Sequence, residues 1–333
     1  MPLRSQEIIE TLDALVEQKL PTFLWGAPGI GKSSVVKQIA EAKGMGFIDL
    51  RLSLMDPTDL KGIPFYENQA HQAVWAPPSF LPREGSGILF LDELNTAAPS
   101  VQASAYQLIL DRKVGEYELP EGWAIVAAGN RENDRGVVYR MPLPLANRFI
   151  HLEMDVNVDD WRRWAYGRGI DERIIGYISA NNAALFGFDP ASDTKSFPTP
   201  RSWEFVNGIL ASGMRDQLAL NAIAGAIGEE RAVDFMAFAK VMHLLPDTDA
   251  VLRGESHEVP EDLSALYALA SALVAKVLKA PDDDVLARLL DYTHLLPPEF
   301  AVLIVQDLQK NGVMMDHLDA YGKWVGKFAF LLQ

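Results

Sequence analysis

The sequence contains no cysteine, and its six histidines are scattered along the chain. Without cysteine there can be no disulfide, thiol nucleophile or cysteine-bound metal, and no pair of histidines has the H-E-x-x-H spacing of a zinc site. Long apolar runs are also missing, because the most apolar stretch, residues 265–280, is interrupted by serine and lysine. We therefore expect this stretch to be a buried amphipathic helix and not a membrane span. The opening MPLRSQEIIETL lacks an apolar core, so we expect no secretory signal and a cytoplasmic protein.

Basic residues are scarce as well, since 30 Lys and Arg stand against 45 Asp and Glu for a net charge of −15. The acidic excess is spread over both halves of the chain, so no basic arm or tail is hidden in it. Proteins that hold nucleic acid by its phosphates usually present a basic surface. The charge argues against a nucleic-acid partner, although a locally basic pore stays possible.

Short apolar runs alternate with helical patterns through the first half of the chain. The runs cover residues 22–26, 47–53, 88–94, 123–130 and 149–154. This alternation predicts a mostly parallel β-sheet covered by helices. From residue 159 onward the strand signals vanish and apolar residues recur at helical spacing.

The chain is therefore predicted to have three parts. An α/β domain spans residues 1–157 and a helical domain spans 158–250. A helical C-terminal extension spans 256–333, after a polar stretch, 246–262, whose proline and glycine indicate a linker.

Residues 26–33 read GAPGIGKS and match the P-loop pattern G-x-x-x-x-G-K-[ST], between an apolar strand and a helix. Glycines let successive backbone N–H groups turn toward phosphates, and the helix adds its positive amino-terminal end. The lysine is suited to the β- and γ-phosphates, and the following serine hydroxyl to Mg²⁺. The predicted ATP-binding residues are Gly26, Ala27, Pro28, Gly29, Ile30, Gly31, Lys32, Ser33 and Ser34. A glycine-rich turn without a ligand is the alternative.

Polar side chains follow two more of the predicted strands. Asp92 and Glu93 end ILFLDE, at the carboxyl end where open α/β sheets bind ligands. Asp92 is suited to hold Mg²⁺ together with Ser33, and Glu93 to activate the attacking water. Asn130 ends WAIVAAGN and can bind that water or the γ-phosphate. Taken alone, each is better explained as a solvated strand end or a turn residue. Together with the P-loop they predict phosphoryl transfer.

In this order GAPGIGKS, LFLDELN, AAGN, PLANRF and TPRS resemble an AAA+ ATPase, specifically the MoxR-like (AAA_5) group. The resemblance covers roughly residues 5–210. It implies a doubly wound parallel sheet with a helical lid, and a homo-oligomer, usually a hexameric ring, with ATP and Mg²⁺ between subunits. It also implies that residues 5–22 help cover the adenine base.

The resemblance also assigns two arginines. Arg148 becomes the arginine finger, which neutralises charge on the γ-phosphate held by the adjacent subunit. Arg201 becomes the sensor of the lid, which contacts the phosphates of its own subunit. Arg131, Arg135 and Arg140 are rivals for the finger, and a structural arginine paired within its own chain is the alternative for Arg148.

Two insertions accompany these motifs. Residues 53–82 are too long for a simple connection, and the resemblance makes them an insert facing the pore, where Phe65, Tyr66 and Trp75 touch a substrate or pack on their own domain. In KVGEYELPEGWAIV, the PEG sequence predicts the turn of a β-hairpin. The C-terminal extension either packs on the lid or docks a partner.

The function expected is that of a MoxR-type AAA+ ATPase that remodels or activates a protein client. Family resemblance adds a partner with a von Willebrand factor A domain. Three alternatives stay open: a nucleic-acid motor, a non-hydrolytic nucleotide switch and a small-molecule kinase. The acidic net charge argues against a nucleic-acid motor, and Glu93 argues against a non-hydrolytic switch. The Asp92–Glu93 pair, Asn130 and the helical C-terminal half are a poor fit to a small-molecule kinase.

Overall fold

The computed structural model describes residues 2–67, 71–131, 134, 139 and 141–331. The chain forms two compact units. Unit 1 comprises Met1–Val156 with Asp189–Ser192, and unit 2 comprises Asn157–Phe188 with Asp193–Gln333. The predicted helical domain and the predicted C-terminal extension thus fall in the same unit. Among the described residues, no helix is long and apolar enough to cross a bilayer.

Unit 1 is built on a five-stranded sheet in the order β2-β5-β8-β1-β9, with every neighbouring pair parallel. All five strands predicted from the apolar runs are confirmed, as is the α/β fold class of a P-loop protein. The strands are β1 (Thr22–Trp25), β2 (Gly46–Arg51), β5 (Gly87–Asp92), β8 (Trp123–Gly129) and β9 (Ile150–Glu153). The two central strands, β5 and β8, are buried almost throughout, because helices cover both faces of the sheet.

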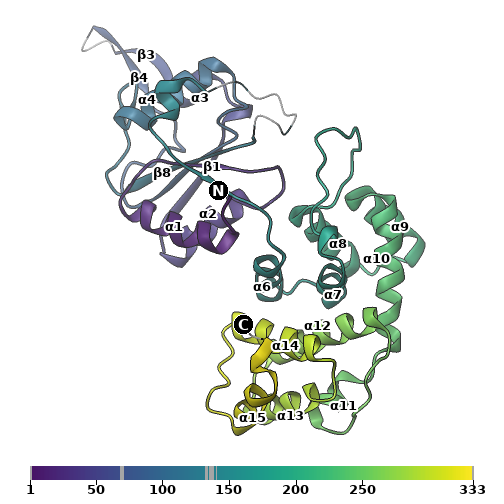
Figure 1. Ribbon diagram of the computed structural model, residues 1–333. Helices are drawn as coiled ribbons and strands as arrows, with labels where there is room; N and C mark the ends of the chain where they lie inside the picture. The colour runs from purple at the N-terminus through teal and green to yellow at the C-terminus, as the bar shows by residue number, and fades with distance from the viewer. Residues whose placement is uncertain (1, 68–70, 132–133, 135–138, 140, 332–333) are drawn as a thin grey trace. The chain divides into compact units, whose positions relative to one another are not determined.

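The helices of unit 1 divide between the two faces (Figure 1). Helices α1 (Ser5–Glu17) and α2 (Lys32–Ala42) cover one face, while α3 (Pro57–Lys61) and α4 (Pro99–Asp111) lie on the other. Alternate strand residues supply the two cores, as the period of a strand requires. On the α4 face, Phe23 and Leu89 join one cluster with Leu108 of that helix.

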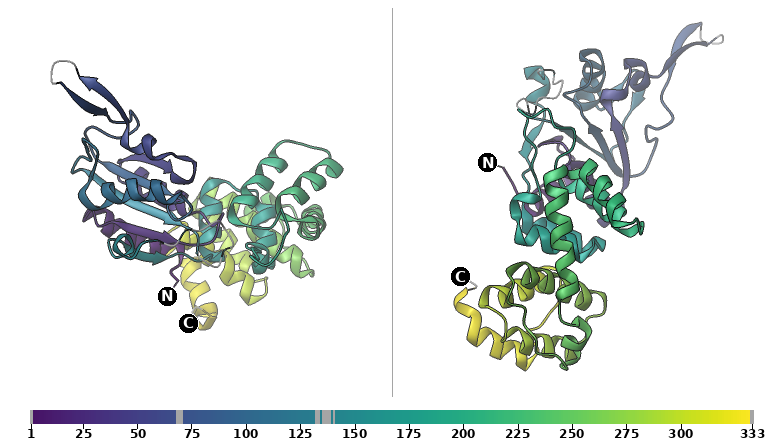
Figure 2. Two further views of the ribbon diagram at one scale, coloured as in Figure 1. Left: turned by 90° about the horizontal axis from the view of Figure 1, so that it is seen from above. Right: turned by 90° about the vertical axis from the view of Figure 1, so that its right-hand side faces the viewer.

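Two small antiparallel hairpins extend from this framework. The first pairs β3 (Ile63–Glu67) with β4 (Gln72–Ala76) and projects from the sheet of its unit (Figures 1 and 2). The second pairs β6 (Lys113–Val114) with β7 (Tyr117–Glu118). Its turn is therefore formed by residues 115–116, and the prediction that residues 120–122 (PEG) make this turn was wrong. The PEG sequence instead leads into β8, where the Trp123 N–H donates to the carbonyl of Pro120 at 3.0 Å.

Unit 2 is helical, as predicted. Its helices are α6 (Val158–Arg168), α7 (Glu172–Ala180), α8 (Pro200–Ala211), α9 (Asp216–Ile227), α10 (Glu229–Val241), α11 (Thr248–Arg253), α12 (Leu263–Lys279), α13 (Asp283–Thr293), α14 (Pro298–Lys310) and α15 (Asp319–Phe328). Short α5 (Leu143–Ala146) belongs to unit 1, and 3-10 turns occur at Leu52–Leu54, Asn182–Ala184, Met242–Leu244 and Ala329–Leu331.

The stretch 246–262, expected to be a linker, contains a helix. Asp247 accepts hydrogen bonds from the N–H groups of Asp249 and Ala250, which caps the start of α11, and Gly254 ends it. A side-chain cap of this kind stabilises a helix by about 1 kcal/mol. Val251 and Leu252 of α11 belong to the same hydrophobic core as residues of α12, α13 and α14. The stretch 246–262 is therefore packed into unit 2.

Candidate functional site

The P-loop lies between the end of β1 and the start of α2, at the carboxyl edge of the sheet. Gly29 and Gly31 have φ values of +77° and +98°, a region that L side chains rarely occupy. Gly31 is the N-cap of α2. A Cβ on Gly26 would lie 2.5 Å from Ile30 Cδ1 and 3.0 Å from the carbonyl oxygen of Met154. The three glycines are therefore required by the backbone path and by its close packing.

Lys32 connects this loop to the end of β8. Its ammonium donates to the carbonyl oxygens of Gly26 at 2.7 Å and Ala27 at 3.0 Å, and to Asn130 Oδ1 at 3.3 Å. Two residues from separate predicted motifs thus meet directly. Lys32 and Ser33 are half-buried at the start of α2, and Ser34 is exposed.

Asp92 and Glu93 end β5 beside β8. The pKa of Asp92 is raised, chiefly by burial and further by the charge of Asp49, while Lys32 opposes the rise. The backbone of Glu93 has a φ of +57°, unusual for a residue with a side chain. The Asp92 carboxylate accepts its N–H at 2.9 Å, which helps to hold this conformation. Such strain persists where surrounding contacts hold it, and it is common at functional sites.

Two residues of this site were not singled out from the sequence. Ser53, just beyond β2, donates from its hydroxyl to the Glu93 carboxylate. Asn95 is 1% exposed and donates from Nδ2 to the carbonyl oxygen of Asn130 at 2.7 Å. Both follow strands of the same sheet, so their position at carboxyl ends is the signal that would have identified them.

The loop arginines differ in their partners. Arg131 is paired within its own unit, to Glu153 at 2.7 Å and to the carbonyl oxygen of Met154 at 3.2 Å. Arg148 follows α5 with an exposed side chain, to which the described part of the chain offers neither a hydrogen bond nor an ion pair. Arg135 and Arg140 lie outside the described residues.

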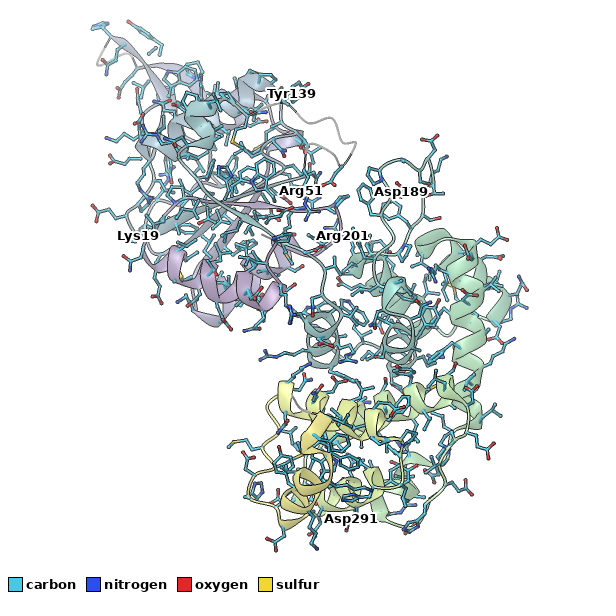
Figure 3. All side chains as sticks on the ribbon, viewed as in Figure 1. Lys19, Arg51, Tyr139, Asp189, Arg201 and Asp291 are labelled. Atoms are coloured by element: carbon cyan, nitrogen blue, oxygen red, sulfur yellow. The ribbon has the colours of Figure 1, made fainter. Side chains whose placement is uncertain are left out.

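Arg201 belongs to unit 2, where it begins α8 behind the Thr199 cap. Thr199 accepts the Ser202 N–H at 3.0 Å and Pro200 occupies the first helical position, which defines the helix start. The side chain of Arg201 is exposed (Figure 3). Its charge and that of Arg168 oppose a rise in the pKa of Glu204 that is caused mainly by burial. The structure thus places Arg201 at the exposed amino-terminal end of α8.

The insert aromatics divide between exposed and packed positions. Phe65 is 50% and Tyr66 60% exposed on the β3–β4 hairpin, whereas Trp75 is half-buried. Ile63 on the same strand is 71% exposed. The hairpin therefore presents apolar side chains that its own unit does not cover.

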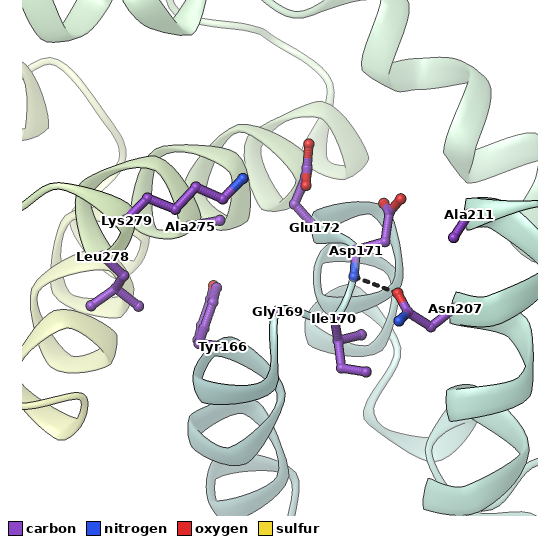
Figure 4. Close-up of a pocket in the computed structure, with 10 residues that line it drawn as sticks. All are labelled: Tyr166, Gly169, Ile170, Asp171, Glu172, Asn207, Ala211, Ala275, Leu278 and Lys279. Atoms are coloured by element: carbon purple, nitrogen blue, oxygen red, sulfur yellow. Dashed lines mark hydrogen bonds between the residues drawn. The ribbon is translucent and has the colours of Figure 1, made fainter.

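A separate pocket of about 350 Å³ lies within unit 2, between α6, α7, α8 and α12 (Figure 4). Tyr166, Glu172 and Lys279 line it, and the Asp171 N–H donates to Asn207 Oδ1 at 2.9 Å on its wall. None of the residues predicted to bind nucleotide lines this pocket. The P-loop, Asp92, Glu93 and Asn130 gather instead at the carboxyl edge of the sheet in unit 1.

Residues 22–151 match the model of the ATPase family associated with various cellular activities (AAA). This range contains the P-loop, Asp92, Glu93, Asn130 and Arg148. Over this range the chain is similar to the AAA family. The chain is also 31% identical over 178 residues to Midasin from Giardia intestinalis, a match that covers 50% of this chain and 4% of Midasin.

Solved structures of similar proteins cover most of the chain at low identity. A RuvB variant from Thermotoga maritima is 18% identical with a TM-score of 0.40, and 85% of each chain is covered. NtrX from Brucella abortus in complex with ATP is 13% identical with a TM-score of 0.41, covering 93% of this chain and 68% of that one. Scores this low carry no information about the function of this chain.

Proposed function

We propose that this protein is a Mg²⁺-dependent ATPase of the MoxR type within the AAA+ proteins. The observation that carries the proposal is the contact of Lys32 Nζ with Asn130 Oδ1 at 3.3 Å. It brings the P-loop to the end of β8, next to the strand that ends in Asp92 and Glu93. A phosphate binder, a metal ligand and a base thus share one edge of the sheet, as ATP hydrolysis requires.

The donor set fits Mg²⁺, which prefers oxygen ligands and retains several waters. Ser33 and Asp92 would hold it, and it would neutralise charge on the β- and γ-phosphates. No three His, Asp or Glu side chains in the described ranges are grouped to hold a metal by themselves. The ion would therefore depend on the nucleotide and water for its other ligands. A cation beside Asp92 would also offset the burial that raises the pKa of this carboxyl.

The residues have distinct roles in the proposed reaction. The backbone N–H groups of the P-loop and Lys32 bind the phosphates, while Glu93 accepts a proton from the attacking water. The water oxygen bonds to the γ-phosphorus as the bond to the β-phosphate oxygen breaks, and ADP and phosphate leave. Asn130 orients the water or the γ-phosphate, and Arg201 contacts the phosphates from the lid of the same subunit.

We further propose that Arg148 completes the site of a neighbouring subunit in a ring. Its exposure and the absence of a partner among the described residues support this assignment over Arg131, which is paired to Glu153. A finger supplied in trans is worth about 10³–10⁵ in rate in comparable phosphoryl transfers. Hydrolysis would then couple neighbouring subunits.

The ring, expected to be hexameric, would act on a protein client, with a von Willebrand factor A domain protein as a partner. The exposed aromatic residues of the β3–β4 hairpin support a protein client, because apolar side chains exposed on a monomer commonly mark interaction sites. The net charge of −15 argues against a nucleic-acid motor.

The experiment that tests the shared site mixes two inactive variants. Glu93→Gln keeps the finger but loses the base, and Arg148→Ala keeps the base but loses the finger. The ATPase rate per subunit of the mixture should exceed that of either variant alone, and the wild-type rate should rise with protein concentration. Arg131→Ala, which loses an arginine paired within its unit, is the matched control and should stay active without any partner variant.

Three outcomes would contradict the proposal. A mixture as inactive as its components would overturn the shared site, and wild-type activity in Arg148→Ala would remove that residue as the finger. Phosphate transfer to an acceptor other than water would replace hydrolysis with kinase activity.

A further inference from the structure

Asn95 is the most buried polar side chain at the carboxyl edge of the sheet in unit 1. One atom of its amide has a hydrogen-bond partner among the described residues and the other has none. Nδ2 donates to the Asn130 carbonyl oxygen at 2.7 Å. Oδ1 is buried without a hydrogen-bond partner. An unsatisfied buried acceptor lowers the free energy of unfolding by about 1–3 kcal/mol. An amide at this position therefore destabilises the fold unless its N–H donor is needed.

The backbone of β8 is shaped to admit this amide. A Cβ on Gly129 would lie 2.1 Å from Asn95 Oδ1 and 2.8 Å from the ring of Phe23. Only glycine therefore allows Asn95 to reach the strand end, which explains the glycine directly before Asn130. The resulting hydrogen bond holds the carbonyl of Asn130, and so helps to fix the backbone from which the Asn130 side chain extends.

The main chain of Asn95 makes a second connection. Its carbonyl oxygen accepts the N–H of Tyr139 at 2.8 Å. Tyr139 precedes the stretch that begins at Met141, a buried residue of the core, and continues through α5 to Arg148. Asn95 also lies two residues after Glu93, whose carbonyl oxygen is held by the Thr96 hydroxyl at 2.9 Å.

We propose that Asn95 is a positioning residue that joins the two halves of the ATPase machinery on one subunit. Its side chain aims Asn130 at the site of its own subunit, and its main chain anchors the stretch that presents Arg148 to the neighbour. This inference rests on the proposed function. Loss of the Asn95 amide impairs a subunit as the holder of a site, because the hydrogen bond to Asn130 is lost. The main-chain bond to Tyr139 remains, so the same subunit can still donate its finger.

The first test is kinetic. Asn95→Ala should lower kcat by about tenfold or more while the KM for ATP changes by less than about twofold, since the phosphate-binding loop is untouched. Gln102→Ala is the matched control, because Gln102 is 3% exposed and donates to the Ala97 carbonyl oxygen at 3.0 Å within the same unit. It loses a comparable buried amide without a link to Asn130, and it should keep its kcat. Equal losses of kcat in the two variants would reduce Asn95 to a structural role.

The isosteric Asn95→Asp variant keeps the shape of the side chain and tests the donor itself. An ionised carboxylate cannot donate to the Asn130 carbonyl, whereas a protonated carboxyl can, and burial favours the protonated form. Its kcat relative to wild type should therefore recover as the pH is lowered from about 8 to about 6. A ratio that does not change with pH would contradict the donor role.

Mixing separates the failure of this inference from failure of the proposed function. Glu93→Gln with Arg148→Ala serves as the reference, and if this pair does not regain ATPase activity, the proposed shared site is wrong. If the pair regains activity, Asn95→Ala should complement Arg148→Ala, because it keeps its finger and its main-chain bond to Tyr139. It should not complement Glu93→Gln, because neither of these two variants has an intact site. Complementation of Glu93→Gln by Asn95→Ala to the level of the reference would show that the site of the Asn95→Ala subunit is intact, and would overturn the inference.

Discussion

The carboxyl of Asp307 connects two helices of unit 2 and makes its stability depend on pH. Asp307 is 4% exposed on α14 and pairs with Arg162 of α6 at 3.1 Å. Burial raises its pKa from 3.8 to about 6, with Arg162 and Lys310 opposing the rise, Asp159 adding to it and a hydrogen bond from Tyr166 lowering it. The folded chain therefore binds the Asp307 proton more tightly than the unfolded chain does.

The direction and size of this pH effect on stability follow from the linkage between proton binding and folding. Because the folded pKa lies above the unfolded one, protonation stabilises the fold at low pH, and this contribution disappears as the pH rises through about 6. For pKa values of 3.8 and about 6, the contribution to the free energy of unfolding falls by about 1.4 kcal/mol between about pH 5 and pH 7.5. Asp307→Asn lacks the titration, so its stability relative to wild type should rise by the same amount over this interval.

Urea unfolding of dilute protein, with wild type and variant compared at each pH, measures the difference. Asp159→Asn is the control, because its carboxylate also pairs with Arg162, at 2.8 Å, but its side chain is 49% exposed. This variant should keep a pH dependence of the same sign but somewhat weaker, because the Asp159 charge contributes to the raised pKa of Asp307. A wild-type and Asp307→Asn difference that stays constant from pH 5 to 7.5, or a carboxyl titration of Asp307 near 4, would refute the reasoning.

Three further predictions concern the proposed site. Ser53→Ala should raise the ATPase rate by up to about tenfold, because it frees the Glu93 carboxylate from a hydrogen bond of about 1.5 kcal/mol. Steady-state phosphate release measures this rate, and an unchanged or lower rate would contradict the prediction. Arg148→Ala should lower kcat by about 10³-fold or more with nucleotide affinity retained, whereas Arg131→Ala should keep most of its activity, and a reversal of this order would transfer the finger to Arg131. Lys32→Met should abolish binding of a fluorescent ATP analogue in equilibrium titration, and retained affinity would refute the phosphate-binding role of this lysine.

The parallel sheet was predictable because its signals are local. Five apolar runs, each bounded by turn residues, correspond to five strands, and buried strands such as β5 and β8 need apolar residues on both faces. The P-loop was equally local, since its glycines, lysine and serine are contiguous. Even the position of Asp92 and Glu93 at the carboxyl end of a strand followed from this pattern.

Two local predictions failed because the sequence allowed competing signals. The PEG sequence has strong turn residues, yet the hairpin turn lies at residues 115–116. The register in which β6 pairs with β7 determines the position of this turn. The polar stretch 246–262 looks like a linker, but Asp247 caps α11 and Val251 reaches the core of unit 2. Tertiary burial outweighs a weak local pattern in a helix this short.

By itself, the sequence determined which residues end the strands and which loop turns toward phosphate, because both depend on neighbours along the chain. Only the tertiary structure decided which of these ends meet. The order β2-β5-β8-β1-β9 places β8 between β5 and β1, so Asn130 reaches Lys32, Asn95 reaches Asn130, and Ser53 reaches Glu93. These contacts join residues that are far apart in sequence, and the strand order and side-chain packing that create them are properties of the folded sheet as a whole.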